Sequence, residues 1–462
     1  MRADLLGESI EGLDEALAAV DAFDGSLVSG LLRPPAEVAV RLAEFAGAVA
    51  GSPLAARTAE AAEKAAAGSA GEDHLVALAA ARTALLGSVH DALTERVAEV
   101  TGRPSLDAVR SPAGAQQSVN LLVAARSWLC DLARAGWRGI DHELVSGAAP
   151  VVSAMLGDPA LRRLATVLDG FAFELAASCP GATLERVPVR RWADLWSRAL
   201  LLTLPGAADA APTGAFTGRL LPLGVDVQEH AGAVQAQVHA VFEPADGAAA
   251  RVVRATVSVP KPDTVVGAGL WQLLRPHMSL LAAVGEGRAM ELSEMPVTAE
   301  GDLLWQEERA RSGDSADAFA TARVALPTAA DSVTAPLDRH PVRIAVPVFL
   351  EGYGVVKDDD GTTFTVAGQA LAVDTDRIPA ASPLTPQAVT GSGACIGLLR
   401  WDAGTYRLQP LAVEATVRRK AVTLHAGGWA GGTADKAGVK AEKAATDAVA
   451  ALRERAGRLL RK

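Results

Sequence analysis

The hydrophobic pattern of this chain changes its period once, and that change constrains the fold more than any motif does. In the first part, apolar residues recur every three to four positions, as Leu75, Leu78 and Leu85 do, which is typical of amphipathic helices. In the second part, apolar and polar residues alternate, as over residues 234–240, which is typical of strands with one buried face. The stretch between them is small, polar and rich in Pro and Gly, so we interpret residues 206–218 as a linker.

Residues 1–205 predict a helical bundle or an irregular helical array. Start signals recur: Pro34 and Pro35 precede one apolar run, and Ser52 with Pro53 precedes the next. Ala is abundant in this part, and Ala loses no side-chain entropy in a helix. Because no fixed repeat period is present, a solenoid is not predicted.

Residues 219–426 predict a mainly antiparallel β domain, either a sandwich or an open barrel, so the fold class is α+β and multidomain. Short alternating runs, among them ADAFATARVAL at 316–326, are interpreted as strands, and turn residues such as DDDG at 358–361 separate them. One helix is expected to interrupt the strands at residues 266–285, where Pro276 should kink or split it.

The C-terminal part combines a Gly-rich stretch with a basic amphipathic helix. Residues 427–433 are expected to be a flexible linker, and residues 434–462 a helix. The segment from Val417 to the C-terminus carries a net charge of +7 in a chain whose total is -10, so the rest carries -17. On this helix Leu452 and Leu459 belong to a narrow apolar stripe, and the basic face holds Arg453, Arg455, Arg458, Arg461 and Lys462.

Three roles remain open for this basic helix. It docks on the acidic body of its own chain, it binds an acidic partner protein in a groove, or it lies on an anionic membrane or a nucleic acid. The stripe lacks Trp and Phe, which disfavours a membrane surface. An acidic body repels phosphate, so nucleic acid is not expected as a partner except through this helix.

The cysteine content and the N-terminal residues favour a cytoplasmic protein. Cys130, Cys179 and Cys395 are few, odd in number and far apart, which predicts neither a disulfide framework nor a cysteine-ligated zinc site. The first residues lack the basic and then apolar layout of a signal peptide. No uninterrupted apolar stretch reaches about 18 residues, so no membrane span is expected.

Three motif-like stretches fail the requirements of the sites that they resemble. TGSGACIG at 390–397 has Ile396 where a dinucleotide-binding loop needs Gly. DHE at 141–143 has Ser146 where a zinc protease needs its second His, and adjacent side chains on a helix diverge, so we interpret Asp141 as the N-cap of a helix. KDDDGTTF at 357–364 lacks the alternation of a calcium loop and predicts a hairpin turn. We therefore predict no catalytic residue, no cofactor and no metal site.

Trp192 and Trp196 lie four residues apart in RRWADLWSRALLL and share one helix face. Packing, at the junction of the helical and β parts, is one interpretation. A solvent-facing Trp pair is the other, and it would be a binding site for a partner protein.

Two stretches, RRWADLWSRALLL and GLLRWDAGTYRLQPLAVEATV, resemble segments of uncharacterised proteins encoded beside MoxR-type AAA ATPases and von Willebrand A proteins in high-GC bacteria. The resemblance covers less than a tenth of the chain and carries no functional residue. It implies an accessory role in a chaperone-like complex.

These observations predict a non-catalytic protein-binding or adaptor protein that uses a domain surface or the basic helix and acts with an AAA ATPase system. The alternative is an enzyme or a small-molecule-binding protein with a pocket at the junction of the helical and β parts, which would hold Trp192, Trp196, Trp271 or Trp305. A deep cleft with converging Asp, Glu, His or Arg side chains favours the alternative. A flat apolar patch favours the adaptor.

Overall fold

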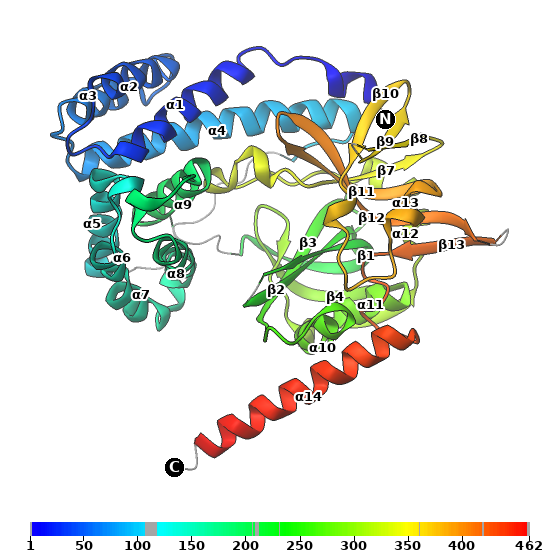
Figure 1. Cartoon of the computed structure of the whole chain (residues 1–462). Coiled ribbons are helices and arrows are strands. Elements are labelled where there is room, and N and C mark those ends of the chain that lie inside the picture. The colour runs from blue at the N-terminus through cyan, green and yellow to red at the C-terminus, as the bar shows by residue number, and fades with distance from the viewer. Residues whose placement is uncertain are drawn as a thin grey trace.

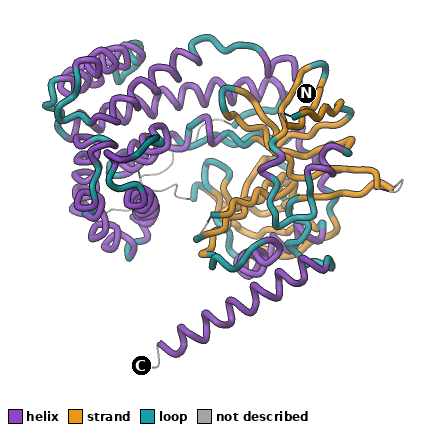
Figure 2. The backbone as a smooth tube through the Cα atoms, in the orientation of Figure 1, coloured by secondary structure: helices purple, strands orange, loops and turns teal. Residues whose placement is uncertain are grey.

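The N-terminal half of the chain is helical and the C-terminal half is built from strands, as the periodicity predicts. The computed structural model describes residues 2–106, 118–205, 207, 212–230, 232–359, 361–417 and 420–459. Figures 1 and 2 show the helices beside two β-sheets and a last helix, α14, that points away from the rest of the molecule. No helix among these described residues is long and apolar enough to cross a membrane.

The helical region surrounds one large apolar core. Phe23 stacks on Phe45 with ring centroids 4.5 Å apart, and Trp196 packs against Phe23 from a third helix. The Asp141 side chain caps its helix by accepting a hydrogen bond from the Leu144 amide at 2.8 Å, as DHE predicts. The helices are α1 (Leu13–Ser29), α2 (Ala36–Ala48), α3 (Ala55–Ala66), α4 (Glu72–Thr101), α5 (Val119–Ala135), α6 (His142–Ser146), α7 (Ala148–Leu156), α8 (Arg162–Ala177) and α9 (Val189–Leu202).

The first β-sheet closes on itself through its shortest strand. Strand β1 pairs with both β2 and β4, and the two-residue strand β5 joins β3 to β4, so the pairings form a ring that the sequence does not reveal. All pairings in this sheet are antiparallel except β3 with β5. Its strands are β1 (Gly214–Glu229), β2 (Ala233–Pro244), β3 (Arg251–Pro260), β4 (Arg288–Val297), β5 (Asp302–Leu303) and β6 (Ala310–Ser315).

The second sheet lies beside the first, and a small apolar cluster that includes Leu223, Ile396 and Phe319 packs between them. Its strand order is β7-β11-β12-β10-β9-β8, with β13 also paired to β12, and only β10 with β12 is parallel. The strands are β7 (Val346–Glu351), β8 (Gly354–Asp358), β9 (Gly361–Val366), β10 (Gln369–Val373), β11 (Ser392–Asp402), β12 (Thr405–Val417) and β13 (Lys420–His425).

The β part contains more helix than the single insertion that we expected. The insertion is split at Pro276, as predicted, into α10 (Leu270–Leu274) and α11 (Ser279–Glu286). The run at 316–326 was expected to be a strand, and that prediction is wrong, because it forms α12 (Ala318–Val324). Asp317 caps this helix, and Phe319 and Ala322 share its buried face, so tertiary packing outweighs the local alternation. A short helix, α13 (Pro386–Thr390), precedes β11.

The two stretches that we expected to be linkers take part in the fold. Strand β1 begins at Gly214, so residues 214–218 of the expected linker belong to the sheet. The Gly-rich stretch 427–433 differs from a flexible linker because it forms turns packed on α11. An added Cβ at Gly427 would lie 2.7 Å from Val284, and Ala430 is fully buried.

Helix α4 joins the helical region to the second sheet. Its N-terminal half contributes Leu78 to the helical core, and its C-terminal half contributes Leu93 and Val97 to the core of the second sheet. The Tyr406 hydroxyl on β12 donates a hydrogen bond to the Leu93 carbonyl at 2.7 Å. The two parts therefore meet along α4, and the cavities described next lie at that junction.

Candidate functional site

Two adjoining cavities lie where the helical region meets the sheets. The first, which we call the His239 cavity, has a volume of about 500 Å³ and is lined by α4, β2, β3 and residues 331–347. The second, the Arg198 cavity, has a volume of about 550 Å³ and is lined by α1, α4, α9, residues 337–343 and the turn between β11 and β12. Arg339 and Arg343 line both cavities, so the two form one junction cleft of a size suited to small molecules.

The wall of the His239 cavity carries polar atoms that lack partners. His239 lies on β2, on the face opposite the buried Val238, and only 2% of it is exposed. Its Nε2 atom and the Oε2 atom of Glu300 are buried and make no hydrogen bond to the described residues. Burial lowers the pKa of His239 to about 3, so its imidazole is neutral at pH 7. A buried polar atom without a partner is costly, so this wall suits a ligand that supplies one.

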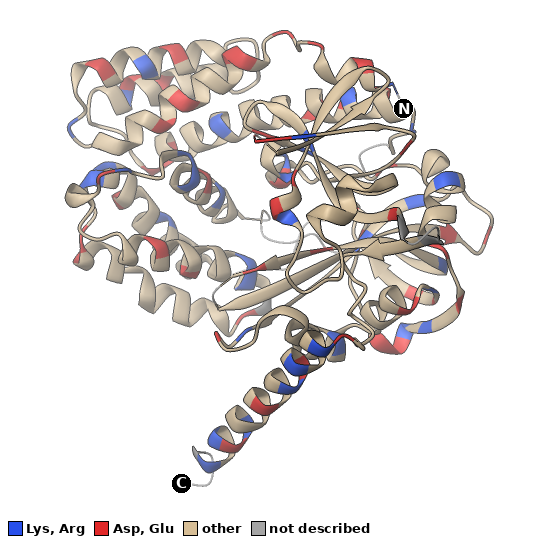
Figure 3. Cartoon of the chain, turned by 45° about the vertical axis from the view of Figure 1, so that its right-hand side comes forward, with Lys and Arg blue, Asp and Glu red and all other residues tan. Residues whose placement is uncertain are grey.

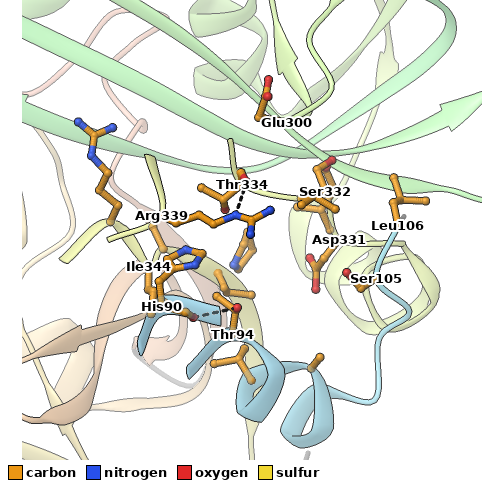
Figure 4. A pocket seen from close by; sticks show the side chains of 18 of the residues that line it. His90, Thr94, Ser105, Leu106, Glu300, Asp331, Ser332, Thr334, Arg339 and Ile344 are labelled. Carbon is orange, nitrogen blue, oxygen red and sulfur yellow. Dashed lines mark hydrogen bonds between the residues drawn. The ribbon is translucent and has the colours of Figure 1, made fainter. Parts of the chain in front are cut away.

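Arg339 extends into the His239 cavity beside Thr334 (Figure 4), and hydrogen bonds to two segments hold its guanidinium group. Its Nε donates to the Thr334 carbonyl at 3.0 Å, and its Nη1 donates to the Asp91 carboxylate at 2.9 Å. The other oxygen of Asp91 lies 3.1 Å from Nδ1 of His90. Burial lowers the pKa of His90, although Asp91 opposes that shift. Arg339 is therefore positioned by residues from both parts of the molecule.

Three guanidinium groups share a single carboxylate at the edge of the Arg198 cavity. Asp338 accepts hydrogen bonds from Arg198 at 2.5 Å, from Arg163 at 3.0 Å and from Arg343 at 3.0 Å. Burial alone would raise the pKa of Asp338, but the three arginines outweigh that effect and lower it. Arg163 comes from α8 and Arg198 from α9, so this cluster ties residues 338–343 to the helical region.

A buried ion-pair network forms the back of the Arg198 cavity. The Arg82 guanidinium, 1% exposed, donates to both oxygens of Asp24 at 2.6 and 2.7 Å and to Asp194 at 2.6 Å. Nε2 of His340 lies 3.1 Å from the same oxygen of Asp194. Burial raises the pKa of Asp24 despite the hydrogen bonds from Arg82. The donors of Arg82 are largely occupied by these contacts, so its role is to hold the wall of the cavity.

The junction cleft has the chemistry of polar recognition. The guanidinium group of arginine binds carboxylate and phosphate oxygens through paired N–H donors. A neutral histidine donates a hydrogen bond from one ring nitrogen and accepts one at the other. The cysteines supply no activated nucleophile there, because burial raises the pKa of Cys130 to about 12 and also raises that of Cys395. Among the described residues, no group of three His, Cys, Asp or Glu side chains is arranged to hold a metal ion.

Trp192 and Trp196 are core residues and not contact residues for a partner. Both are at most 1% exposed. Trp192 packs edge-on against Trp137 at 5.8 Å, and Nε1 of Trp196 donates to the Leu129 carbonyl at 2.9 Å. The packing interpretation of this pair therefore holds, but inside the helical region and not at the junction. Neither Trp lines the junction cleft, and neither do Trp271 and Trp305.

Helix α14 (Lys436–Leu459) has one docked part and one free part. Ala445 is 1% exposed and packs with Ala441 against Gly269, at the start of α10. Beyond Ala448 the helix leaves the body, and Leu452 is 46% exposed. Arg453, Arg455 and Arg458 are exposed on this free part, which ends at Leu459, and Arg461 and Lys462 lie outside the described residues.

The residues that form the junction cleft were not predicted as site residues from the sequence. The segment DRHPVR at 338–343 places Asp338, Arg339, His340 and Arg343 within six positions. This density of charged residues in a stretch between predicted strands could have indicated a polar binding site. Nothing in the sequence around its partners Arg163 and Arg198 distinguishes them from ordinary surface arginines of helices.

Comparison of the chain with protein-family models, with curated proteins and with solved structures found no match.

Proposed function

We propose that this chain is a protein-binding or adaptor protein whose free helical segment, residues 449–459, engages an acidic groove on a partner protein. The observation that carries the proposal is that the free segment projects from the body while the first half of α14 is anchored (Figures 1 and 3). Anchoring removes much of the entropy cost of presenting a helix to a partner.

The apolar face of α14 continues from the docked half into the free segment. Ala445 and Ala448 pack on the body, and Leu452, one turn further, has no cover there. A groove on a partner protein that accepts Leu452 would bury the part of the apolar face of α14 that the body of this chain leaves exposed.

The charge of the free segment favours an acidic partner. Arg453 and Arg455 make no ion pair with any described residue, and Arg458 pairs only with Glu454 of the same helix. Helix α14 carries a net charge of +3 in a chain whose total is -10. Charge complementarity speeds association and selects among partners.

The partner to examine first is a MoxR-type AAA ATPase, because the sequence resemblance implies an accessory role beside such enzymes. We place the encounter in the cytoplasm. The three cysteines are free, and two of them are buried, which fits a reducing compartment.

Site-specific photo-crosslinking tests this proposal. A photo-reactive amino acid at position 452 is expected to capture one other protein in the native cell, whereas one at Val324, an even more exposed position on α12, is not. The captured protein, once purified, should bind the intact chain about ten times more tightly than the Arg453→Glu/Arg455→Glu variant at low salt.

The control reverses two charges on the docked half of the same helix. Lys440→Glu/Lys443→Glu should leave the affinity within about twofold, because the proposed contact lies beyond Ala448. Capture of only a second copy of this chain, or of no protein, would contradict the proposal.

A second candidate function is the binding of a small molecule in the junction cleft. The specific observation in its favour is the convergence of Arg339, Arg343 and the partnerless His239 on adjoining cavities, which meets the criterion set by the sequence analysis.

A further inference from the structure

We propose that the Arg198 cavity binds a small-molecule oxyanion, a carboxylate or phosphate group held by the guanidinium groups of Arg198 and Arg343. This site lies apart from the free segment of α14, so the inference is independent of the proposed adaptor function; it rests on the second candidate function and names the class of its ligand.

The local charge balance is the first argument. Arg163, Arg198 and Arg343 face one another across Asp338, so two positive charges remain unneutralised within the cluster. Desolvation by burial lowers the pKa of Arg343, and the neighbouring cations Arg198 and Arg163 repel its charge and lower the pKa further, although Asp338 opposes the shift. An anion would relieve this repulsion.

The availability of donors is the second argument. A guanidinium group has five N–H donors in a planar fork. Arg198 uses only Nη2, and Arg343 uses only Nη1, in hydrogen bonds to the described residues. Both side chains line the cavity, and Arg339 lies beside them, so several donors face a space of about 550 Å³. This geometry suits an oxyanion, which accepts paired N–H groups.

Preorganisation is the third argument. Arg198 is 19% exposed and is anchored on α9, while Asp338 holds its guanidinium from behind. The Arg82 network keeps Asp194 and His340 in place on the same wall. The donors are therefore fixed before a ligand arrives, which lowers the entropy cost of binding.

A purely structural role is the competing explanation. In that case the three arginines serve only to tie residues 338–343 to α8 and α9 through Asp338. The two explanations differ in what an added anion does, and in what happens when Asp338 loses its charge.

Isothermal titration calorimetry of the full chain with pyrophosphate, and separately with citrate, tests the proposal. We expect saturable binding of at least one of them at low salt. Arg198→Gln/Arg343→Gln should weaken that binding about 10- to 100-fold, because each variant site loses a charge-assisted hydrogen bond. Arg219→Gln is the control, since Arg219 is about as exposed as Arg343 and pairs with Glu243 outside the cleft. The affinity of this variant for the probe should stay within about twofold of that of the native chain.

Asp338→Asn separates the two explanations without removing an arginine. If the site binds oxyanions, this variant should bind the same probe at least as tightly as the native chain. The probe should also raise the midpoint of its thermal unfolding by more than it raises that of the native chain, because an added anion replaces the lost carboxylate.

Each remaining outcome overturns the inference. These are no saturable binding of either probe, equal binding by the native chain and the Arg198→Gln/Arg343→Gln variant when thermal unfolding shows both to be folded, or an Asp338→Asn chain whose unfolding midpoint the probe does not shift.

Discussion

At the scale of single residues, the interior of the helical region holds a charge that must stay paired. Arg82 and Asp24 are each 1% exposed and meet in a two-point hydrogen bond. Taking two charges out of water is costly, and their attraction offsets the cost only while both are present. A buried pair of this kind fixes one arrangement of α1, α4 and α9, because any other leaves a charge without its partner.

Truncating Arg82 should therefore be severe. Arg82→Ala leaves Asp24 and Asp194 without their shared cation, and we expect the free energy of unfolding to fall by about 3–5 kcal/mol in urea denaturation. Arg134→Ala removes an exposed pair with Asp131 and should cost less than about 1 kcal/mol. A loss below 1 kcal/mol for Arg82→Ala would show that the network is not essential to stability.

His239 should make stability depend on pH. Its pKa is about 3 in the fold and about 6.5 when unfolded, so between these values the unfolded chain binds more protons. Stability from this group is therefore present above pH 6.5 and is lost as the pH falls, by about 2 kcal/mol between pH 7 and pH 5.

The His239→Gln variant isolates this contribution from that of other histidines. We expect its free energy of unfolding, measured by urea denaturation at pH 7 and at pH 5, to change by about 2 kcal/mol less than that of the native chain. Equal pH dependence of the two proteins would mean that the fold does not lower the pKa of His239.

At the scale of elements, close backbone contacts position α14. Gly285 in α11 lies against Gly431 of the turn that leads to α14, and an added Cβ at Gly285 would come within 3.0 Å of Cα of Gly431. Helix α11 and this turn approach so closely because Gly285 has no side chain at the contact. The stretch that composition marks as flexible is therefore a tight joint, and it sets the direction of the last helix.

Substituting alanine at two helical glycines tests this joint. Gly285→Ala should destabilise the protein by about 1–3 kcal/mol through overpacking. Gly170→Ala in α8, where an added Cβ meets nothing within 4 Å, should be neutral or stabilise by up to about 1 kcal/mol. Thermal unfolding of both variants gives the comparison, and equal midpoints would show that the contact at Gly285 relaxes freely.

At the scale of the whole molecule, α4 makes the helical region and the second sheet depend on each other. Leu78 and Leu93 lie on one helix but belong to different cores. Because the two cores share a continuous helix, the opening of one exposes the end of the other. The junction cleft lies along this helix, so its shape depends on both parts.

Leu93→Ala should weaken both parts at once. The side chain is fully buried, and its truncation should cost about 2–5 kcal/mol. Hydrogen exchange is expected to show amides of α9 and of β12 losing protection together. Leu452→Ala, at an exposed position, should change neither. Loss of protection in β12 alone would show that the two parts unfold independently.

Much of the fold could be predicted because hydrophobic period is a local property. The helical first part, the antiparallel strands, the split at Pro276 and the Asp141 cap each depend on residues a few positions apart, and the sequence by itself determined them. Helix α12 could not be predicted, because the buried contacts of Phe319 and Ala322 come from other elements. A pocket at the junction was the alternative expectation, but the residues that form it could not be predicted: Asp338 meets Arg163 and Arg198 across 175 and 140 positions. Only the tertiary structure decided that convergence. Electrostatic and packing partners are neighbours in space, and their positions in the sequence follow no regular spacing.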